Sequence, residues 1–152
     1  MPLVQLFMKQ LSGICLAVLC LAIRPAAAAD AGDPAGLWLT AKKDTVVRIE
    51  HCDDSLCGYI VWLRADVVKK TPRGEPMCGQ KVLWGVKQSG SDPDLWEGGH
   101  IYKADDDKEY DAWIRLKDNG KLKLRVYLVL PFLGKTKTLT RTTAAEYPPC
   151  SN

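Results

Sequence analysis

The segment from Trp96 to Tyr102 carries the side chains best suited to recognition or catalysis, because an acid, an imidazole and aromatic rings surround two consecutive glycines. Paired glycines within a strand are typical of a bulge, a bend or the close approach of a backbone or ligand. Strand alternation predicts that Trp96, His100 and Tyr102 share one face, with Glu97 on the other. If the first face lines a lumen, it would suit a mostly apolar ligand oriented by a hydrogen bond. If it faces outward, the same side chains only cover the sheet.

Two further tryptophans, Trp62 and Trp84, lie in strongly apolar segments, so we expect them in the core or the lumen. The resulting set of candidate ligand-binding residues is Trp62, Trp84, Trp96, His100 and Tyr102.

An enzymatic alternative would require Glu97, His100 and Tyr102 to converge on one cleft. The sequence contains two histidines, His51 and His100, and no Gly-x-Ser-x-Gly nucleophile elbow. The acidic run at residues 105–107 lacks the spaced ligands and glycine of a dedicated calcium loop, so we interpret it as a solvated turn. We therefore predict no enzymatic activity and assign no catalytic residue, metal ligand or cofactor.

The first 29 residues have the pattern of a secretory signal peptide, with Lys9 before an apolar run, Leu11–Ile23, and small residues at Ala27–Ala29. A membrane-spanning helix needs roughly 20 apolar residues, and this run is shorter. We expect cleavage after Ala29, no transmembrane segment afterwards, and a periplasmic or secreted protein formed by residues 30–152.

Of the six cysteines, four follow the predicted cleavage site, and four cysteines allow three pairings. Cys52 and Cys57 flank four turn-prone residues, which predicts a β-hairpin closed by a disulfide between directly opposed positions. Cys78 then pairs with Cys150 by elimination. A metal site that uses His51, Cys52 and Cys57 is the alternative, but an oxidising compartment favours disulfides.

Charge excludes one class of partner. Removal of Lys9 and Arg24 with the signal leaves 19 basic and 18 acidic residues, a net charge of +1. A nearly neutral chain without a basic stripe is not typical of nucleic-acid binding. A small apolar ligand or an envelope component is the partner that we expect instead.

Short β-rich runs separated by turn signals predict an all-β fold of eight strands. From Leu122 to Leu128 the even-numbered residues are apolar, while the odd-numbered residues from Lys121 to Arg125 are basic, as expected of a sheet with one buried face. Eight sequential strands favour an antiparallel up-and-down barrel, with a β-sandwich as the alternative. The predicted strands are Gly36–Thr40, Thr45–His51, Tyr59–Arg64, Lys81–Lys87, Leu95–Lys103, Glu109–Lys117, Lys121–Leu130 and Lys135–Thr142.

An ordered set of motifs extends from Gly36 to Arg141. It comprises Gly36-Leu-Trp38, Cys52-x4-Cys57-Gly58, Ile60-Val-Trp-Leu63, Trp96-Glu-Gly-Gly99, Ile101-Tyr102 and Leu133-Gly-Lys-Thr136. This set resembles the bacterial envelope proteins catalogued as domain of unknown function 2147 (DUF2147). The resemblance implies an exported, lipocalin-like β-barrel spanning residues 30–152 with a short C-terminal tail, and it implies no established activity. By similarity to lipocalins, Trp38 would pack at the closed end of the barrel under a cation–π contact from Arg141.

Three functions follow as hypotheses. The first is non-covalent binding of a small, mostly apolar ligand in the barrel. The second is a structural or interaction role in the cell envelope, with a filled barrel. The third is an envelope enzyme that uses Glu97, His100 and Tyr102. A cavity above roughly 300 Å³ would favour the first hypothesis over the second.

Overall fold

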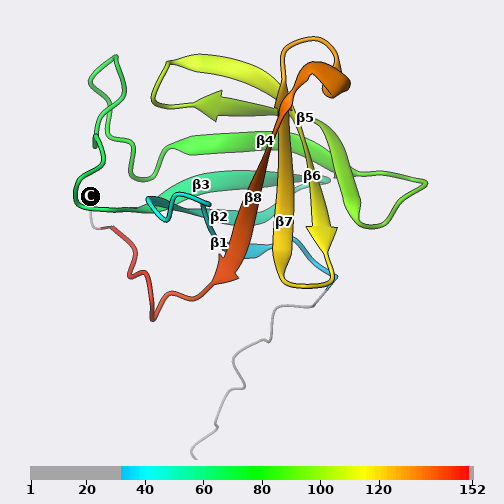
Figure 1. Ribbon diagram of the computed structural model, residues 1–152, viewed down its shortest axis with the longest axis horizontal. Helices are drawn as coiled ribbons and strands as arrows, with labels where there is room; N and C mark the ends of the chain where they lie inside the picture. Colours follow the sequence, from blue (N-terminus) through cyan, green and yellow to red (C-terminus); the bar gives the residue numbers. More distant parts are fainter. Residues whose placement is uncertain (1–31, 151–152) are drawn as a thin grey trace, which may run out of the picture.

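The computed structural model describes residues 32–150, which form eight antiparallel strands closed into a barrel in sequential order (Figure 1). The predicted barrel is confirmed, and the sandwich alternative is wrong. The predicted signal peptide lies outside the described residues. Within residues 32–150, no helix is long and apolar enough to cross a membrane. The strands are β1 (Gly36–Leu39), β2 (Thr45–Cys52), β3 (Ser55–Leu63), β4 (Lys81–Gln88), β5 (Leu95–Lys103), β6 (Lys108–Lys117), β7 (Lys121–Tyr127) and β8 (Lys135–Thr142).

Strand β7 ends earlier than the sequence predicts. The apolar run that follows Tyr127 leaves the ladder and leads into a short 3₁₀ helix, η1 (Pro131–Leu133). Pro131 has no backbone N–H to donate to a ladder, and its fixed φ suits the first position of a helical turn. The loop between β7 and β8 is therefore a distinct structure and not a continuation of the sheet.

One half of the barrel interior is filled by its own side chains. Trp38 is fully buried and lies in a cluster to which every strand contributes. Alternation, reset by bulges in the β2–β3, β3–β4 and β5–β6 pairs, sends these residues inward, so the barrel buries one face and leaves the other to the solvent. The cluster is Trp38, Ile49, Leu56, Leu83, Val86, Trp96, Ala112, Ile114, Leu116, Leu122 and Leu139.

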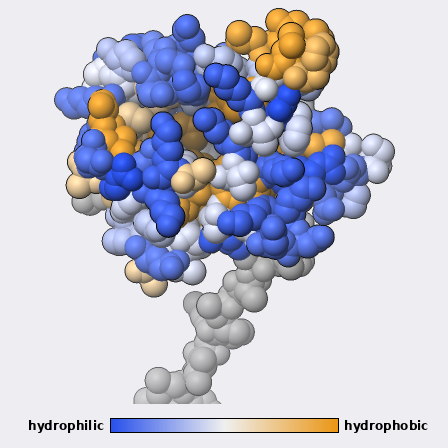
Figure 2. Space-filling view, viewed as in Figure 1, coloured by the Kyte–Doolittle hydropathy of each residue, from blue (hydrophilic) through white to orange (hydrophobic). Residues whose placement is uncertain are grey.

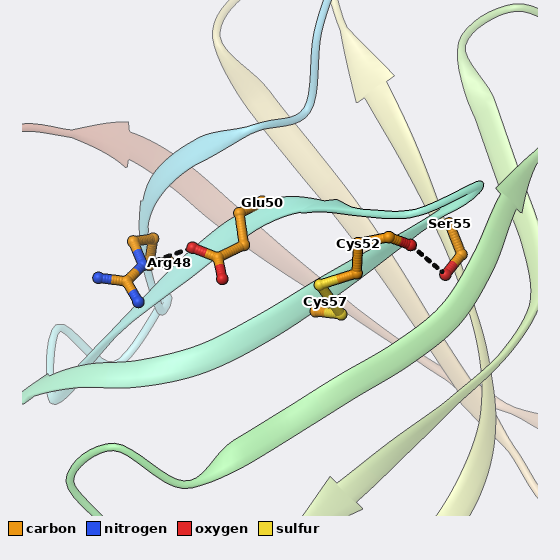
Figure 3. Close-up of a disulfide and its surroundings, with 5 residues drawn as sticks. All are labelled: Arg48, Glu50, Cys52, Ser55 and Cys57. Carbon is orange, nitrogen blue, oxygen red and sulfur yellow. Dashed lines mark hydrogen bonds and ion pairs between the residues drawn. A yellow bond between two sulfur atoms is a disulfide. The ribbon is translucent and has the colours of Figure 1, made fainter.

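The first disulfide joins Cys52 to Cys57 on the β2–β3 hairpin (Figure 3). The pairing agrees with the sequence prediction, but the geometry differs. Cys52 is opposite Ser55, and Cys57 is opposite Glu50, so the bond runs diagonally and not between opposed residues. The strands extend to a two-residue turn, in which Asp53 adopts a φ of 55°. The Cα atoms of the two cysteines are 5.8 Å apart, a distance that a disulfide spans readily.

The second disulfide joins Cys78, in the connector between β3 and β4, to Cys150 in the C-terminal tail. The tail covers part of the outer barrel surface, because the N–H of Cys150 donates to the carbonyl of Val61 at 2.8 Å. Tyr147 packs edge-on against Trp62, with ring centroids 4.8 Å apart. This crosslink therefore fixes a segment that would otherwise hold to the barrel by few contacts.

Replacing both cysteines by serine, one disulfide at a time, should show how much each disulfide contributes to the stability of the protein. The pairs are 5 and 72 residues apart in sequence. By loop-closure entropy, loss of the Cys78–Cys150 bond should cost about 4 kcal/mol and loss of the Cys52–Cys57 bond about 2 kcal/mol. Urea unfolding followed by circular dichroism measures both. A larger loss of unfolding free energy in Cys52→Ser/Cys57→Ser than in Cys78→Ser/Cys150→Ser would show that the short crosslink stabilises more of the barrel than its own hairpin.

Candidate ligand-binding pocket

The barrel is closed at the end where its first and last strands meet. The guanidinium of Arg141, on β8, lies over the Trp38 ring, 4.4 Å from the centroid. The same guanidinium donates to the carbonyls of Asp33, at 2.7 Å, and Ala35, at 2.9 Å. The indole N–H of Trp38 donates to the carbonyl of Pro34 at 2.7 Å. The segment before β1 is thereby tied across this end, which agrees with the pairing that the lipocalin resemblance implies.

Charge reinforces this closure. Burial lowers the pKa of Arg141, with Asp33 acting in the opposite direction. Burial raises the pKa of Asp33, but the hydrogen bond from the Ala35 N–H and the contact with His51 outweigh it and lower the pKa below its usual value. The carboxylate is therefore ionised at neutral pH and balances the half-buried guanidinium.

The other end of the barrel is open. A cavity of about 570 Å³ lies between strands β5–β6 and β7–β8. Its apolar wall includes Ile101, Leu124 and Val126, and Tyr110 adds an aromatic ring. Because Ile101 and Leu124 also pack against the buried cluster around Trp38, the floor of the pocket is continuous with the core. The lumen is therefore filled at the closed end and open at the mouth.

Two lysines on β8 face this pocket. Lys137 is opposite Leu124, and Lys135 is opposite Val126, so each shares the inward face with its partner. Both line the cavity, and within residues 32–150 neither ammonium group has a hydrogen-bond or ion-pair partner. The pocket therefore offers two unpaired positive charges beside an apolar wall.

A third lysine of the pocket is already neutralised. Lys103 forms ion pairs with Asp105 and Asp106, and its hydrogen bond to Asp106 raises its pKa. The hydroxyl of Tyr110 also donates to Asp106, at 3.3 Å. This side of the mouth is thus an internal polar network and is less suited to receive an anion than the β8 side.

The pocket lip is formed by residues 128–133, and Arg125 fixes its position. The Arg125 guanidinium donates to the carbonyls of Pro131, at 2.7 Å, and Phe132, at 2.9 Å, and to Thr136 Oγ1 at 2.8 Å. A Cβ on Gly134 would collide with the carbonyl oxygen of Val126 and come within 2.8 Å of the Tyr127 Cβ. The loop therefore returns to the barrel along a path that only glycine permits.

The structure does not bring the five candidate residues from the sequence together. Trp96 is buried inside the barrel, whereas His100 is exposed and forms an ion pair with Asp111 at 3.3 Å. The prediction that they share a face is wrong, because a β-bulge between Trp96 and Gly99 resets the alternation. Gly98 adopts a φ of 74°, which explains the glycine there.

The paired glycines thus serve the backbone. Gly99 lies so close to β4 that a Cβ would collide with the Val86 side chain and approach the carbonyl oxygen of Trp84 to 2.6 Å. Bulge and close approach were two of the outcomes that the sequence suggested. The neighbouring strand, and not a ligand, is what approaches Gly99.

The other candidates lie on the outer surface. Tyr102 is buried beneath the β3–β4 connector, where its hydroxyl donates to Asp107 at 2.7 Å and accepts from Arg73 at 3.4 Å. Trp62 packs under the C-terminal tail, and Trp84 lies beside His100 with ring centroids 5.9 Å apart. None of the five lines the pocket.

The enzymatic alternative depended on Glu97, His100 and Tyr102. Burial raises the pKa of Tyr127, and the charges of Asp111 and Glu97 raise it further, so both carboxylates lie near that phenol. His100 also contacts Asp111. Tyr102, with its connector partners, belongs to a separate network. His100 and Tyr102 therefore have different polar partners, Asp111 for His100 and Asp107 with Arg73 for Tyr102.

Comparison with known proteins identifies the family. Residues 36–141 match the sequence profile described as "Uncharacterized protein conserved in bacteria (DUF2147)". The chain belongs to the DUF2147 family. A solved structure with a similar fold is described as "Protein HP1028 from the human pathogen Helicobacter pylori belongs to the lipocalin family", with a TM-score of 0.63 and 20% identity over 75% of this chain and 86% of that chain. No curated protein matches the chain.

In this DUF2147 barrel, sequence reasoning missed the lysines of the pocket. Leu139 faces the core, so the residues two and four positions earlier on β8, Lys137 and Lys135, face the same way. That signal was present in the alternating run Lys135–Thr142. It was overlooked because basic residues in a strand are ordinarily assigned to the solvent face.

Replacing Arg141 by alanine tests the closed end of the DUF2147 barrel. Loss of two charge-assisted hydrogen bonds and the contact with Trp38 should lower the free energy of unfolding by about 3 kcal/mol. Lysine at the same position keeps the charge but not the planar fork, so it should restore only part of the loss. Urea unfolding measures both variants, with Lys108→Ala as a surface control. Wild-type stability in Arg141→Ala would contradict the assigned role.

Proposed function

We propose that the barrel binds, non-covalently, a small and mostly apolar molecule that carries an anionic group. The observation that carries the proposal is the open half of the lumen, where an apolar wall and two unpaired lysines face one cavity of about 570 Å³. The apolar body of the ligand would lie against Ile101, Leu124 and Val126. Its anionic group would lie at the mouth, within reach of Lys135 and Lys137.

The size of the cavity supports this proposal over a filled, purely structural barrel. Small-molecule sites typically enclose roughly 300–1,000 Å³, with a mostly apolar lining and few polar groups that orient the ligand. The pocket has both properties, and its volume of about 570 Å³ lies within that range. Only the closed half of the lumen has the packing that a structural barrel requires throughout.

The charge of the lysines supports an anionic and not a neutral ligand. Lys135 and Lys137 are exposed to solvent where they line the pocket, so their ammonium groups are accessible to a ligand there. Within residues 32–150 neither group has a hydrogen-bond or ion-pair partner that would compete with an anionic ligand. A carboxylate or similar group would supply charge-assisted hydrogen bonds to both.

We propose that binding takes place outside the cytoplasm and involves no catalytic step. Two disulfides in a small domain are typical of an oxidising compartment. The signal-like pattern of residues 1–29 supports export to the periplasm or beyond. The pocket side chains are suited to binding and orientation, and the acidic residues near its mouth are occupied by Lys103.

Binding of dodecanoate and of dodecanol, measured by isothermal titration calorimetry, tests this function. Lys135→Ala/Lys137→Ala should weaken dodecanoate binding by about tenfold, which is about 1.4 kcal/mol, and should leave dodecanol binding unchanged. Val126→Trp should fill the cavity and abolish binding of both ligands. The matched control is Lys69→Ala/Lys70→Ala, which removes two exposed charges from the connector and should behave as wild type.

Two results would overturn the proposal. One is the absence of binding of either ligand to the wild-type protein. The other is an equal effect of Lys135→Ala/Lys137→Ala on the acid and the alcohol, which would remove the role assigned to the lysines.

A further inference from the structure

The β7–β8 loop exposes the most apolar surface of the described chain. We call residues 128–133 the apolar lip, which has the sequence Leu-Val-Leu-Pro-Phe-Leu. Figure 2 shows it as a hydrophobic protrusion at the upper right of the molecule. Of the six exposed large apolar residues within residues 32–150, five belong to the lip, and the sixth is Val68. Exposed apolar surface concentrated in this way marks an interaction site.

We propose that the apolar lip inserts into the surface of an anionic lipid bilayer and so docks the mouth of the barrel on the membrane. The exposed fractions of Val129 and Phe132 are 78% and 73%. Both side chains would leave water on insertion. This inference rests on the outer surface of the lip and does not require the pocket to hold a ligand.

The lip is held in a shape suited to insertion. The guanidinium of Arg125 is occupied by hydrogen bonds to two lip carbonyls and to Thr136 on β8, so it ties the lip to the barrel. The backbone of η1 is closed by the N–H of Gly134, which donates to the carbonyl of Pro131 at 3.2 Å. Polar groups of the loop backbone are thus partly satisfied inside the protein. That arrangement lowers the cost of moving the loop into a medium without water.

Residue types favour a bilayer over a protein partner. The contact residues that contribute most to protein–protein affinity are enriched in tryptophan, tyrosine and arginine, whereas leucine and valine are under-represented. The lip presents leucine, valine and phenylalanine, and its one neighbouring arginine is bonded to the loop itself. Its convex shape also suits insertion better than it suits a flat or grooved protein surface.

Charge complementarity favours an anionic surface. Lys135 and Lys137 lie two and four residues after the end of the lip and are unpaired within the described part of the chain. On the opposite side of the mouth, Lys103 pairs with both Asp105 and Asp106 and so compensates part of their negative charge. Lysines beside a bilayer strengthen its binding to anionic lipids, and salt weakens that contribution.

Docking by the lip would place the pocket at the membrane. The lip also forms part of the pocket lining, through Leu128, Val129, Leu130 and Leu133. The mouth of the pocket would therefore open at the bilayer surface. An apolar molecule could then pass between lipid and pocket without crossing water. Phe132 belongs to the lip but not to the pocket lining, which makes it the residue that separates docking from ligand binding.

Flotation with vesicles of phosphatidylglycerol and phosphatidylethanolamine tests the proposal, and pure phosphatidylcholine vesicles serve as the uncharged comparison. Wild-type protein should float with the anionic vesicles at low salt and less at high salt. Phe132→Ser should reduce the bound fraction at least tenfold. Val68→Ser, which replaces an equally exposed apolar residue on the connector, should bind as wild type. In the absence of vesicles, dodecanoate binding by Phe132→Ser should be unchanged, which also shows that the variant is folded.

Three results would overturn membrane docking and leave the ligand proposal standing. The first is that the wild-type protein stays unbound to anionic vesicles at low salt. The second is that Phe132→Ser floats with those vesicles as the wild-type protein does. Finally, sedimentation without vesicles could reveal a dimer that Phe132→Ser abolishes, in which case the lip is an interface between two copies of the chain.

Discussion

The pairing of β1 with β8 is the constraint on which the rest of the structure depends. β1 has four residues and contacts β8 through three register pairs, with Trp38 opposite Arg141. Closure gives the sheet an inside and an outside, so residue parity along each strand decides burial. The Arg141 guanidinium stabilises this short junction, because it bonds to the carbonyls of Asp33 and Ala35 and lies over the indole ring of Trp38.

The interior that results is asymmetric along β8. Arg141, Leu139, Lys137 and Lys135 all face inward, and they run in that order from the closed end to the mouth. At the closed end the charge is compensated by backbone carbonyls and Asp33. In the middle Leu139 packs in the core. At the mouth the two lysines have no protein partner among the described residues, so the same strand both seals the barrel and supplies the charge that we assign to ligand recognition.

The barrel could be predicted from the sequence because several strands alternate without interruption, as in the even-numbered apolar residues of β7, and because turn signals separate all eight strands. The pocket could not, for two physical reasons. A bulge at Gly98 reverses the face of His100 and Tyr102 relative to Trp96, and a glycine pair alone does not reveal whether it produces a bulge. The surroundings of Tyr102 depend on Arg73, which lies 29 residues away in the sequence and reaches it only through the fold of the connector. Inward lysines also run against the usual preference of charged residues for the solvent face.

The central claim is that the closed half of the lumen is packed and the open half binds an anionic amphiphile. Methyl NMR spectra of isotope-labelled protein, recorded during titration with dodecanoate, test it most directly. We expect the largest shifts at Ile101, Leu124 and Val126, with little change at Ile49 in the packed half. Shifts concentrated at Ile60, Leu63 and Val82, which surround Tyr102, would place the site elsewhere. The absence of any shift at saturating dodecanoate would contradict binding in the lumen altogether.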